Sequence, residues 1–144
     1  IVLRQQVPLP GICVGAQLLT RGSEEGDELG LGWVQAITVR FMPPAHSALK
    51  VPHMGWNTVE PVQSVELFES DGTRPRFYFV HSYFIRCDDR KSILCSTNYG
   101  GEFASGVQRG HIFGVQFHPE KSHKFGLMFL RRWCAIKMYT QMDI

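Results

Sequence analysis

"GICVGAQLL", residues 11–19, places a single cysteine between two glycines where a short apolar segment gives way to helical spacing. Residues 7–11 predict a strand, and residues 14–20 predict a helix that follows it after a sharp turn. A strand, a turn and a helix in this order are typical of an α/β protein. The sequence of the turn also raises a question of chemistry.

Glycine, any residue, cysteine, any residue, glycine describes a nucleophile elbow. Gly11 and Gly15 would make room for the tight turn, and the sulfur of Cys13 would lie at the helix N-terminus. There the helix dipole favours the thiolate, and the N–H of Val14 would face a developing oxyanion. On the motif alone, a buried cysteine without a catalytic role is the alternative.

A second stretch, "VQFHPEKS" at residues 115–122, offers the partners that a thiol nucleophile needs. A nucleophile requires a base, and the base requires an orienting group. Pro119 blocks a helix and biases His118 towards extended backbone, so His118 and Glu120, two residues apart, would point the same way. A surface histidine beside a solvated glutamate is the alternative for this pattern by itself.

The remaining sequence predicts one α/β domain over residues 1–144. Its 44% hydrophobic residues suffice for one core, and no internal repeat divides the chain. The segments between the two motifs alternate loops and strands without intervening helices, which predicts a mixed sheet. We expect a loop at 21–32, a strand at 33–41, an irregular surface segment at 42–57, strands at 76–85 and 92–98, two short strands within 105–119, and an amphipathic closing helix from residue 123.

Composition excludes several function classes. The net charge of +2 comes from scattered basic residues, so neither a nucleic-acid surface nor a membrane anchor is indicated. No apolar run is long enough to span a membrane. The four cysteines lie far apart without a C-x-x-C pair, which argues against a metal site or a disulfide framework and favours a reducing, cytoplasmic compartment.

Five segments in this order, "GICVGAQLL", "SEEG", "KVPHMGWN", "YFVHSY" and "GVQFHPEKS", closely resemble the glutaminase subunits of imidazole glycerol phosphate synthase. These subunits are class I, triad-type glutamine amidotransferases. "KVPHMGWN" is the specific part, because other triad amidotransferases share the elbow and "HPE" but not this stretch. The resemblance implies a flavodoxin-like three-layer sandwich that hydrolyses L-glutamine without a cofactor and passes ammonia to a partner cyclase or synthase subunit.

The resemblance also implies roles for individual residues. Cys13 would be the nucleophile, His118 the general base and acid, and Glu120 its orienting group. The residues implied at the glutamine substrate are Val14, Gln17, Glu25, Ser82 and Tyr83, and those implied at the partner interface are Trp56, Tyr78 and Lys121. Without the resemblance, the two interface aromatics would be interpreted as core residues and the lysine as a solvated charge.

The resemblance leaves some alternatives open. The family's opening strand, helix and glycine-containing loop have no counterpart here, so we expect N-terminal strands to be absent from this chain, which would correspond to the C-terminal portion of the family domain. A truncated, non-catalytic docking module is therefore one alternative to a glutaminase. Another is an ammonia supplier for a sugar amidotransferase of surface-polysaccharide synthesis, and a cysteine peptidase is more distant. His53 and His81 are expected to be structural or part of the substrate or partner surface.

Overall fold

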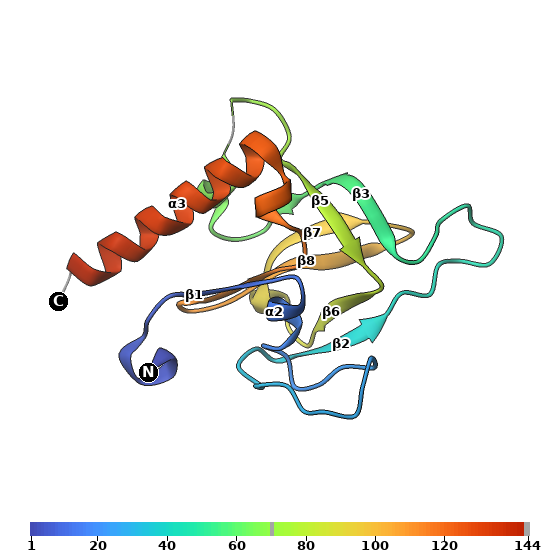
Figure 1. The fold of residues 1–144 in the computed structure, drawn as a ribbon, viewed down its shortest axis with the longest axis horizontal. Helices are drawn as coiled ribbons and strands as arrows, with labels where there is room; N and C mark the ends of the chain where they lie inside the picture. The colour runs from blue at the N-terminus through green and yellow to red at the C-terminus, as the bar shows by residue number, and fades with distance from the viewer. Residues whose placement is uncertain (70, 143–144) are drawn as a thin grey trace.

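The computed structural model describes residues 1–69 and 71–142, which form a mixed β-sheet, a two-stranded β-sheet and a long closing helix (Figure 1). The larger sheet has seven strands. They are β1 (Leu9–Ile12), β2 (Ala36–Arg40), β4 (Glu60–Pro61), β6 (Tyr83–Cys87), β7 (Ile93–Asn98), β8 (Glu102–Arg109) and β9 (Ile112–Val115).

The smaller sheet and the helices complete the described part of the chain. The smaller sheet pairs β3 (His53–Thr58) with β5 (Arg76–His81). The helical elements are α1 (Val2–Gln5), α2 (Val14–Gln17), α3 (His123–Met142) and the 3-10 turns η1 (Val65–Leu67), η2 (Arg90–Ser92) and η3 (Pro119–Lys121).

Both directions of strand pairing occur in the larger sheet. The order is β1-β9-β8-β6-β2, and β7 pairs with both β8 and β4. β1 runs parallel to β9, whereas the other pairs of named strands in the described chain are antiparallel. The α/β class with a mixed sheet, predicted from the sequence, is confirmed. The β1–β9 pairing also brings the two motif-bearing segments together, because each motif directly follows one of these strands.

Two apolar clusters cover opposite faces of the larger sheet. Neighbouring residues of β8, Phe103 and Ala104, belong to different clusters, as do Ile112 and Phe113 of β9. Successive side chains of a strand point to opposite faces, so the clusters lie on the two sides of the sheet. One cluster includes aromatic residues of α3 and β5, and the other includes Ala16 of α2. The larger sheet is therefore a middle layer.

Two predicted elements differ from the structure. Residues 76–85, predicted as one strand, form two strands in different sheets, because the chain leaves β5 and enters β6 at Ser82. The segment 42–57 is irregular only in its first part, since its last residues form β3. Its prolines dominate the local pattern, while pairing with β5, from Thr58↔Arg76 to His53↔His81, creates the strand.

The closing helix agrees with its predicted periodicity. Phe125, Phe129 and Trp133 of α3 are buried in the aromatic cluster. Gly126 permits a close approach of α3 to η3, because a Cβ at this position would lie 1.7 Å from the carbonyl oxygen of Pro119. The helix thereby supports the turn that carries Glu120. None of the helices in residues 1–69 and 71–142 is long and apolar enough to cross a membrane.

Candidate active site

The sharp turn between β1 and α2 is a strained elbow centred on Cys13. This residue has φ 52° and ψ −112°, a region that non-glycine residues rarely adopt. Its N–H donates to the Val115 carbonyl oxygen at 2.8 Å, which ties the elbow to the end of β9. A Cβ at Gly11 would lie 2.6 Å from the Gly15 carbonyl oxygen, as the elbow requires, but a Cβ at Gly15 would meet nothing within 4 Å. The expectation that Gly15 relieves a clash of its own side chain is wrong, since Gly11 alone needs that space.

The environment of the Cys13 sulfur differs from the thiolate-favouring site predicted from the sequence. Burial raises the pKa of the Cys13 thiol more than the N–H of Val14 and the side chain of Gln116 lower it. The Glu120 charge raises this pKa further, and Lys121 opposes it. The N-terminus of the short helix α2 acts on the sulfur through the Val14 N–H, and its lowering effect is smaller than the raising effect of burial. The sulfur is therefore a thiol, which would need a base to act as a nucleophile.

His118 and Glu120 form a close pair, the arrangement that a general base and its orienting group require. Nδ1 of His118 lies 2.6 Å from Oε1 of Glu120. The carboxylate accepts from Nδ1–H, which leaves the lone pair of a neutral imidazole on Nε2. That Nε2 is buried and has no hydrogen-bond partner in the described part of the chain. An unpaired buried acceptor is costly in a merely structural residue and useful in a base.

The local backbone at this pair is not the extended one predicted from the sequence. His118 itself is extended, with φ −104° and ψ 94°, but Pro119 opens the 3-10 turn η3 instead of preventing one. Proline at the first position of a helical turn loses no internal hydrogen bond, since its nitrogen would be unpaired there. The side chains of His118 and Glu120 still meet, so the predicted pairing is correct for a partly wrong reason.

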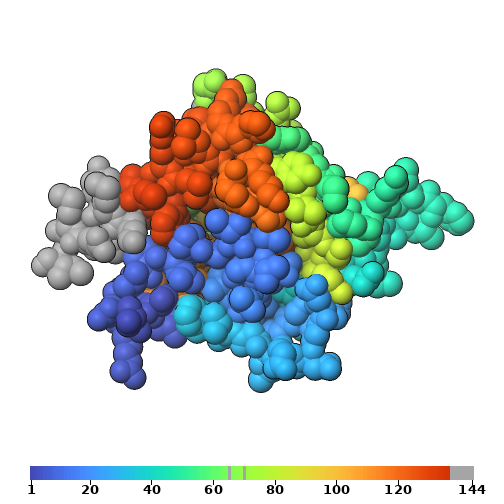
Figure 2. All heavy atoms as spheres, viewed as in Figure 1, coloured from blue at the N-terminus to red at the C-terminus, as the bar shows by residue number. Residues whose placement is uncertain are grey.

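The turn is held in place by buried Ser122. Its Oγ donates to the His118 carbonyl oxygen and accepts from the Tyr78 N–H of β5 at 2.9 Å. His118 N–H in turn donates to the Tyr78 carbonyl oxygen at 2.9 Å. These bonds fix His118 against β5, while the Cys13–Val115 bond fixes Cys13 against β9. Figure 2 shows the N-terminal segment in contact with the C-terminal one on the same face of the molecule.

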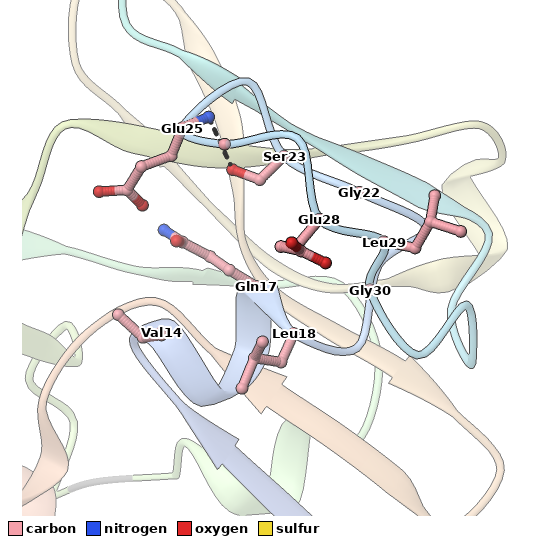
Figure 3. Close-up of a pocket in the computed structure, with 10 residues that line it drawn as sticks. Val14, Gln17, Leu18, Gly22, Ser23, Glu25, Glu28, Leu29 and Gly30 are labelled. Carbon is pink, nitrogen blue, oxygen red and sulfur yellow. Dashed lines mark hydrogen bonds between the residues drawn. The ribbon is translucent and has the colours of Figure 1, made fainter.

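A hollow of about 290 Å³ opens beside Cys13. Of the residues implied at the catalytic cysteine and the glutamine substrate, six line this hollow, namely Cys13, Val14, Gln17, Glu25, Ser82 and Tyr83. A second hollow, of about 220 Å³, shares three of these residues. Figure 3 shows Gln17 and Glu25 extending towards the same opening from α2 and from the loop after it.

The polar groups of this hollow are partly engaged with each other. Gln17 Nε2 donates to the Tyr83 carbonyl oxygen at 3.3 Å and to Gln116 Oε1 at 3.1 Å. Ser82 contributes its carbonyl oxygen to the Phe41 N–H at 3.0 Å. The Glu25 carboxylate is exposed, and its own N–H donates to Ser23 Oγ at 3.1 Å. The free carboxylate is thus available to a cationic or amide group of a ligand.

The three residues implied at a partner interface lie on adjacent elements. Trp56 of β3 is directly opposite Tyr78 of β5, with ring centroids 6.3 Å apart. Trp56 is 44% exposed and stacks on His123, and Lys121 on η3 is exposed. The interpretation of Trp56 as a core aromatic is therefore wrong, because strand alternation turns it outward while its neighbours Gly55 and Asn57 are only partly exposed.

Sequence reasoning missed Gln116 and underrated a histidine pair. Gln116 is fully buried, and its Nε2 lies 3.8 Å from Cys13 Sγ. Its position two residues before His118, on the same side of the strand end, was the available signal. His53 and His81 lie opposite each other in the small sheet, 2% and 5% exposed, with His53 Nδ1 2.9 Å from His81 Nε2. His81 Nδ1 lies 2.7 Å from the Tyr83 carbonyl oxygen.

This buried pair predicts acid sensitivity of the fold. Burial lowers the pKa of His53 to about 4. Burial is also the main cause that lowers the pKa of His81 to about 3. The hydrogen bond to the Tyr83 carbonyl opposes this shift, and the nearby His53 and His118 add to it. Unfolding returns both to about 6.5, so the unfolded chain binds more protons between these values. The stabilisation is complete above pH 6.5 and is lost as the pH falls. We expect the pair to lower the free energy of unfolding by about 2–3 kcal/mol between pH 8 and pH 5.5, measured by reversible urea unfolding.

The control for this pH effect is exposed His46. His46→Gln should keep the wild-type pH slope, whereas the double variant His53→Phe, His81→Phe should lose it. Equal slopes in the wild type and the double variant would show that other groups cause the acid sensitivity.

Comparisons with known proteins identify the family and several relatives of this chain. The family model described as "Glutamine amidotransferase class-I" matches residues 2–137. The protein named imidazole glycerol phosphate synthase subunit HisH 2 from Methanococcus maripaludis is 48% identical, with 92% of this chain and 64% of the relative covered. HisH from Bdellovibrio bacteriovorus and HisH 2 from Pseudomonas aeruginosa are each 46% identical over 94% of this chain, and 67% and 66% of their lengths are covered. The chain thus spans about two thirds of the length of these relatives.

Solved structures show the same fold at lower sequence identity. A putative GMP synthase protein from Thermoplasma acidophilum superposes with a TM-score of 0.66 at 22% identity, covering 94% of this chain and 60% of that one. A glutamine amidotransferase from Thermotoga maritima gives a TM-score of 0.59 at 20% identity, covering 99% and 53%. The resemblance to the glutaminase subunits is confirmed by the curated relatives, and the chain belongs to the class I glutamine amidotransferase family.

Proposed function

We propose that residues 1–144 act as one glutamine amidotransferase domain, which hydrolyses L-glutamine to glutamate and ammonia and delivers the ammonia to a synthase subunit. The observation that carries this proposal is the His118–Glu120 pair at 2.6 Å, with an unpaired buried Nε2, beside a strained cysteine elbow. Family membership and the hollow lined by the implied substrate residues support it.

The first half of the reaction forms a tetrahedral adduct of glutamine on the Cys13 sulfur. Because burial keeps the Cys13 thiol protonated, His118 Nε2 takes the Sγ proton as the sulfur attacks the carboxamide carbon of glutamine. The carbonyl electron pair moves to oxygen, where the Val14 N–H donates to the oxyanion. Glu120 holds Nδ1–H and stabilises the imidazolium that forms.

The second half releases both products. The His118 imidazolium gives its proton to the amide nitrogen as the carbon–nitrogen bond breaks; ammonia leaves, and the acyl group remains on Sγ as a thioester. His118 then takes a proton from water, which attacks the thioester carbon. As the carbon–sulfur bond breaks, the His118 imidazolium returns this proton to Sγ, so the Cys13 thiol is restored and glutamate departs. No hydrogen bond joins Sγ to Nε2 among the described residues, so substrate binding must bring the two groups into line; such tightening on binding is common.

We assign binding of the glutamine substrate to the hollow beside Cys13. The exposed carboxylate of Glu25 suits the substrate's ammonium or amide group, and Gln17 lines the same hollow. Ser82 and Tyr83 line the hollow as well. The proposal involves no metal or other cofactor.

We propose the cyclase subunit of imidazole glycerol phosphate synthase, in histidine biosynthesis, as the partner. The names of the curated relatives support this choice. The exposed face formed by Trp56, Tyr78 and Lys121 would be the docking surface, and the two chains would form a heterodimer. A cytoplasmic location fits the four free cysteines, of which Cys134 is exposed.

The test is to measure glutamate and ammonia production with and without candidate partners from the same organism. We expect the cyclase subunit to form a complex with this protein and to raise glutamine hydrolysis, whereas the synthase of a sugar amidotransferase should do neither. Stimulation by the sugar synthase alone would overturn the pathway assignment. A complex with the cyclase subunit in which Cys13 never reacts with a glutamine analogue would instead indicate a docking module.

A further inference from the structure

The buried pair His53 and His81 belongs to a directed chain of hydrogen bonds. A carbonyl oxygen only accepts, so the contact with the Tyr83 carbonyl places a proton on Nδ1 of His81. Nε2 of His81 then accepts from Nδ1–H of His53, and Nε2 of His53 accepts from the side-chain amide of Asn57 at 3.2 Å. Both imidazoles are therefore neutral and carry their proton on Nδ1.

The chain continues from the Tyr83 carbonyl oxygen to the nucleophile. That oxygen also accepts from Nε2 of Gln17, whose second contact is Oε1 of Gln116. Nε2 of Gln116 lies 3.8 Å from Sγ of Cys13. The Tyr83 carbonyl is thus a junction that receives one donor from the histidine pair and one from the wall of the hollow.

The chain of hydrogen bonds begins on β3, the strand that carries exposed Trp56. Asn57 follows Trp56 on β3, and its side-chain amide also donates to the Asn98 carbonyl oxygen at 3.0 Å. Because residues alternate along a strand, β3 turns Trp56 outward and keeps His53 and Asn57 together on its other face, within the chain of hydrogen bonds. β3 therefore carries both exposed Trp56 and the first members of the hydrogen-bond chain that leads to the substrate hollow.

Two other roles for the histidines are excluded by their contacts. All four ring nitrogens are engaged, so neither ring offers a free lone pair to a metal ion or to a substrate proton. Simple filling of the aromatic core does not account for them either. His53 stacks between Phe79 and Tyr99, with centroids at 4.8 and 4.0 Å, and a phenylalanine would satisfy this packing without burying polar nitrogens.

We propose that His53 and His81 are positioning residues for glutamine, which act as a neutral imidazole relay that fixes the Tyr83 carbonyl and, through it, the side chains of Gln17 and Gln116 beside Cys13. This proposal rests on the glutaminase function proposed above. The relay moves no proton during turnover. Its effect is on the shape and polarity of the substrate hollow, and therefore on glutamine recognition more than on the reactivity of the sulfur.

The test compares variants that differ in the donor to Tyr83. His81→Phe keeps the ring but removes the donor, whereas His81→Asn places an amide donor close to the position of Nδ1. His53→Phe interrupts the relay one step earlier, and His111→Phe is the matched control, since His111 Nε2 contacts the Val2 carbonyl oxygen at 3.1 Å, away from the hollow. Each protein is studied with its partner subunit bound.

The readout separates substrate positioning from sulfur reactivity. We expect His81→Phe to slow modification of Cys13 by a diazo ketone analogue of glutamine about tenfold, as for the loss of one positioning hydrogen bond, and to raise KM more than it lowers kcat. Modification by iodoacetamide should change less than about twofold, since that reagent needs no positioning. His81→Asn should recover most of the loss, and His111→Phe should behave as the wild type. Equal effects of His81→Phe and His81→Asn, or equal slowing with both reagents, would overturn the relay.

Nuclear magnetic resonance tests the relay independently of glutamine turnover. Proton–nitrogen spectra should show both imidazoles protonated on Nδ1 and unchanged from pH 8 to pH 5.5, and His81→Phe should shift the Tyr83 carbonyl carbon and the Gln17 side-chain amide. A histidine that titrates in this range, or an unmoved Gln17 amide, would contradict the proposal. If the wild type reacts with iodoacetamide but not with the analogue, the proposed glutaminase function fails, and these spectra still decide whether the relay exists.

Discussion

Replacing Cys13 with alanine is expected to abolish glutamine hydrolysis, with turnover at least about 10⁴-fold below that of the wild-type complex. The covalent route requires the sulfur, and no other described nucleophile sits on the elbow. The substrate hollow should remain intact, because the elbow conformation is held by the Cys13 N–H bond to Val115 and by the space at Gly11, not by the sulfur. The measurement is glutamate release at saturating glutamine with the partner subunit present.

The same assignment is tested by chemical labelling. A glutamine-analogue electrophile should modify Cys13 alone, because it alone of the four cysteines lines the hollow. Burial raises the pKa of Cys87 to about 11, with a smaller contribution from Asp88, and burial raises that of Cys95 to about 12, so both are inert. Cys134 is exposed and serves as the control. Cys134→Ala should leave labelling by the analogue unchanged, and labelling chiefly at Cys87, Cys95 or Cys134 would remove Cys13 from the mechanism.

The sequence predicts the local features of the site better than the contacts between segments. Glycine spacing around Cys13 predicts the elbow because a steric requirement within five residues determines it, and the structure shows this requirement at Gly11. For the pKa of the Cys13 thiol, the sequence predicts the wrong direction. Helix-end electrostatics can be estimated from sequence, whereas desolvation depends on which distant segments cover the sulfur.

The same reasoning explains the errors in the strands. The run 76–85 is uniformly aromatic and β-branched, so nothing local marks the change of sheet at Ser82. The change of sheet matters for the proposed relay, because it brings the His81 side chain within hydrogen-bond distance of the Tyr83 carbonyl oxygen at the wall of the hollow. The sequence does not predict β3, because a segment of mixed polarity becomes a strand only through its partner, β5.

The roles within the histidine pair could not be read from sequence at all. A histidine in an apolar strand predicts burial, but the tautomer of His81 follows from a carbonyl two residues along, and that of His53 follows from His81. Gln116 escaped notice for a similar reason, because a glutamine carries no chemical signature until Gln17 and Cys13 are seen beside it.

Replacing Glu120 with glutamine is expected to lower turnover about 10²- to 10⁴-fold while KM for glutamine changes less than about twofold. The carboxylate accepts from His118 Nδ1–H at 2.6 Å and so keeps the lone pair on Nε2. An amide can donate to Nδ1 instead, which would place the proton on Nε2 and leave the imidazolium without its counter-charge. Since Glu120 is 49% exposed, solvent screens part of its charge, and we expect the lower half of this range.

The control for this variant is Glu60→Gln. Glu60 is an exposed residue of β4 that pairs with Arg74 at 3.5 Å and forms no ion pair with His118 in the described part of the chain. Glu60→Gln should keep wild-type turnover, which separates loss of the orienting group from a general loss of one negative charge. Wild-type turnover of Glu120→Gln in the complex would exclude Glu120 from the mechanism. Equal losses in kcat and in glutamine binding would instead indicate that the η3 turn had moved. The η3 turn is held by the hydrogen bonds of Ser122 and by the packing of Gly126, and neither uses the Glu120 side chain. A loss in kcat with little change in KM should therefore report the electrostatic role of the carboxylate alone.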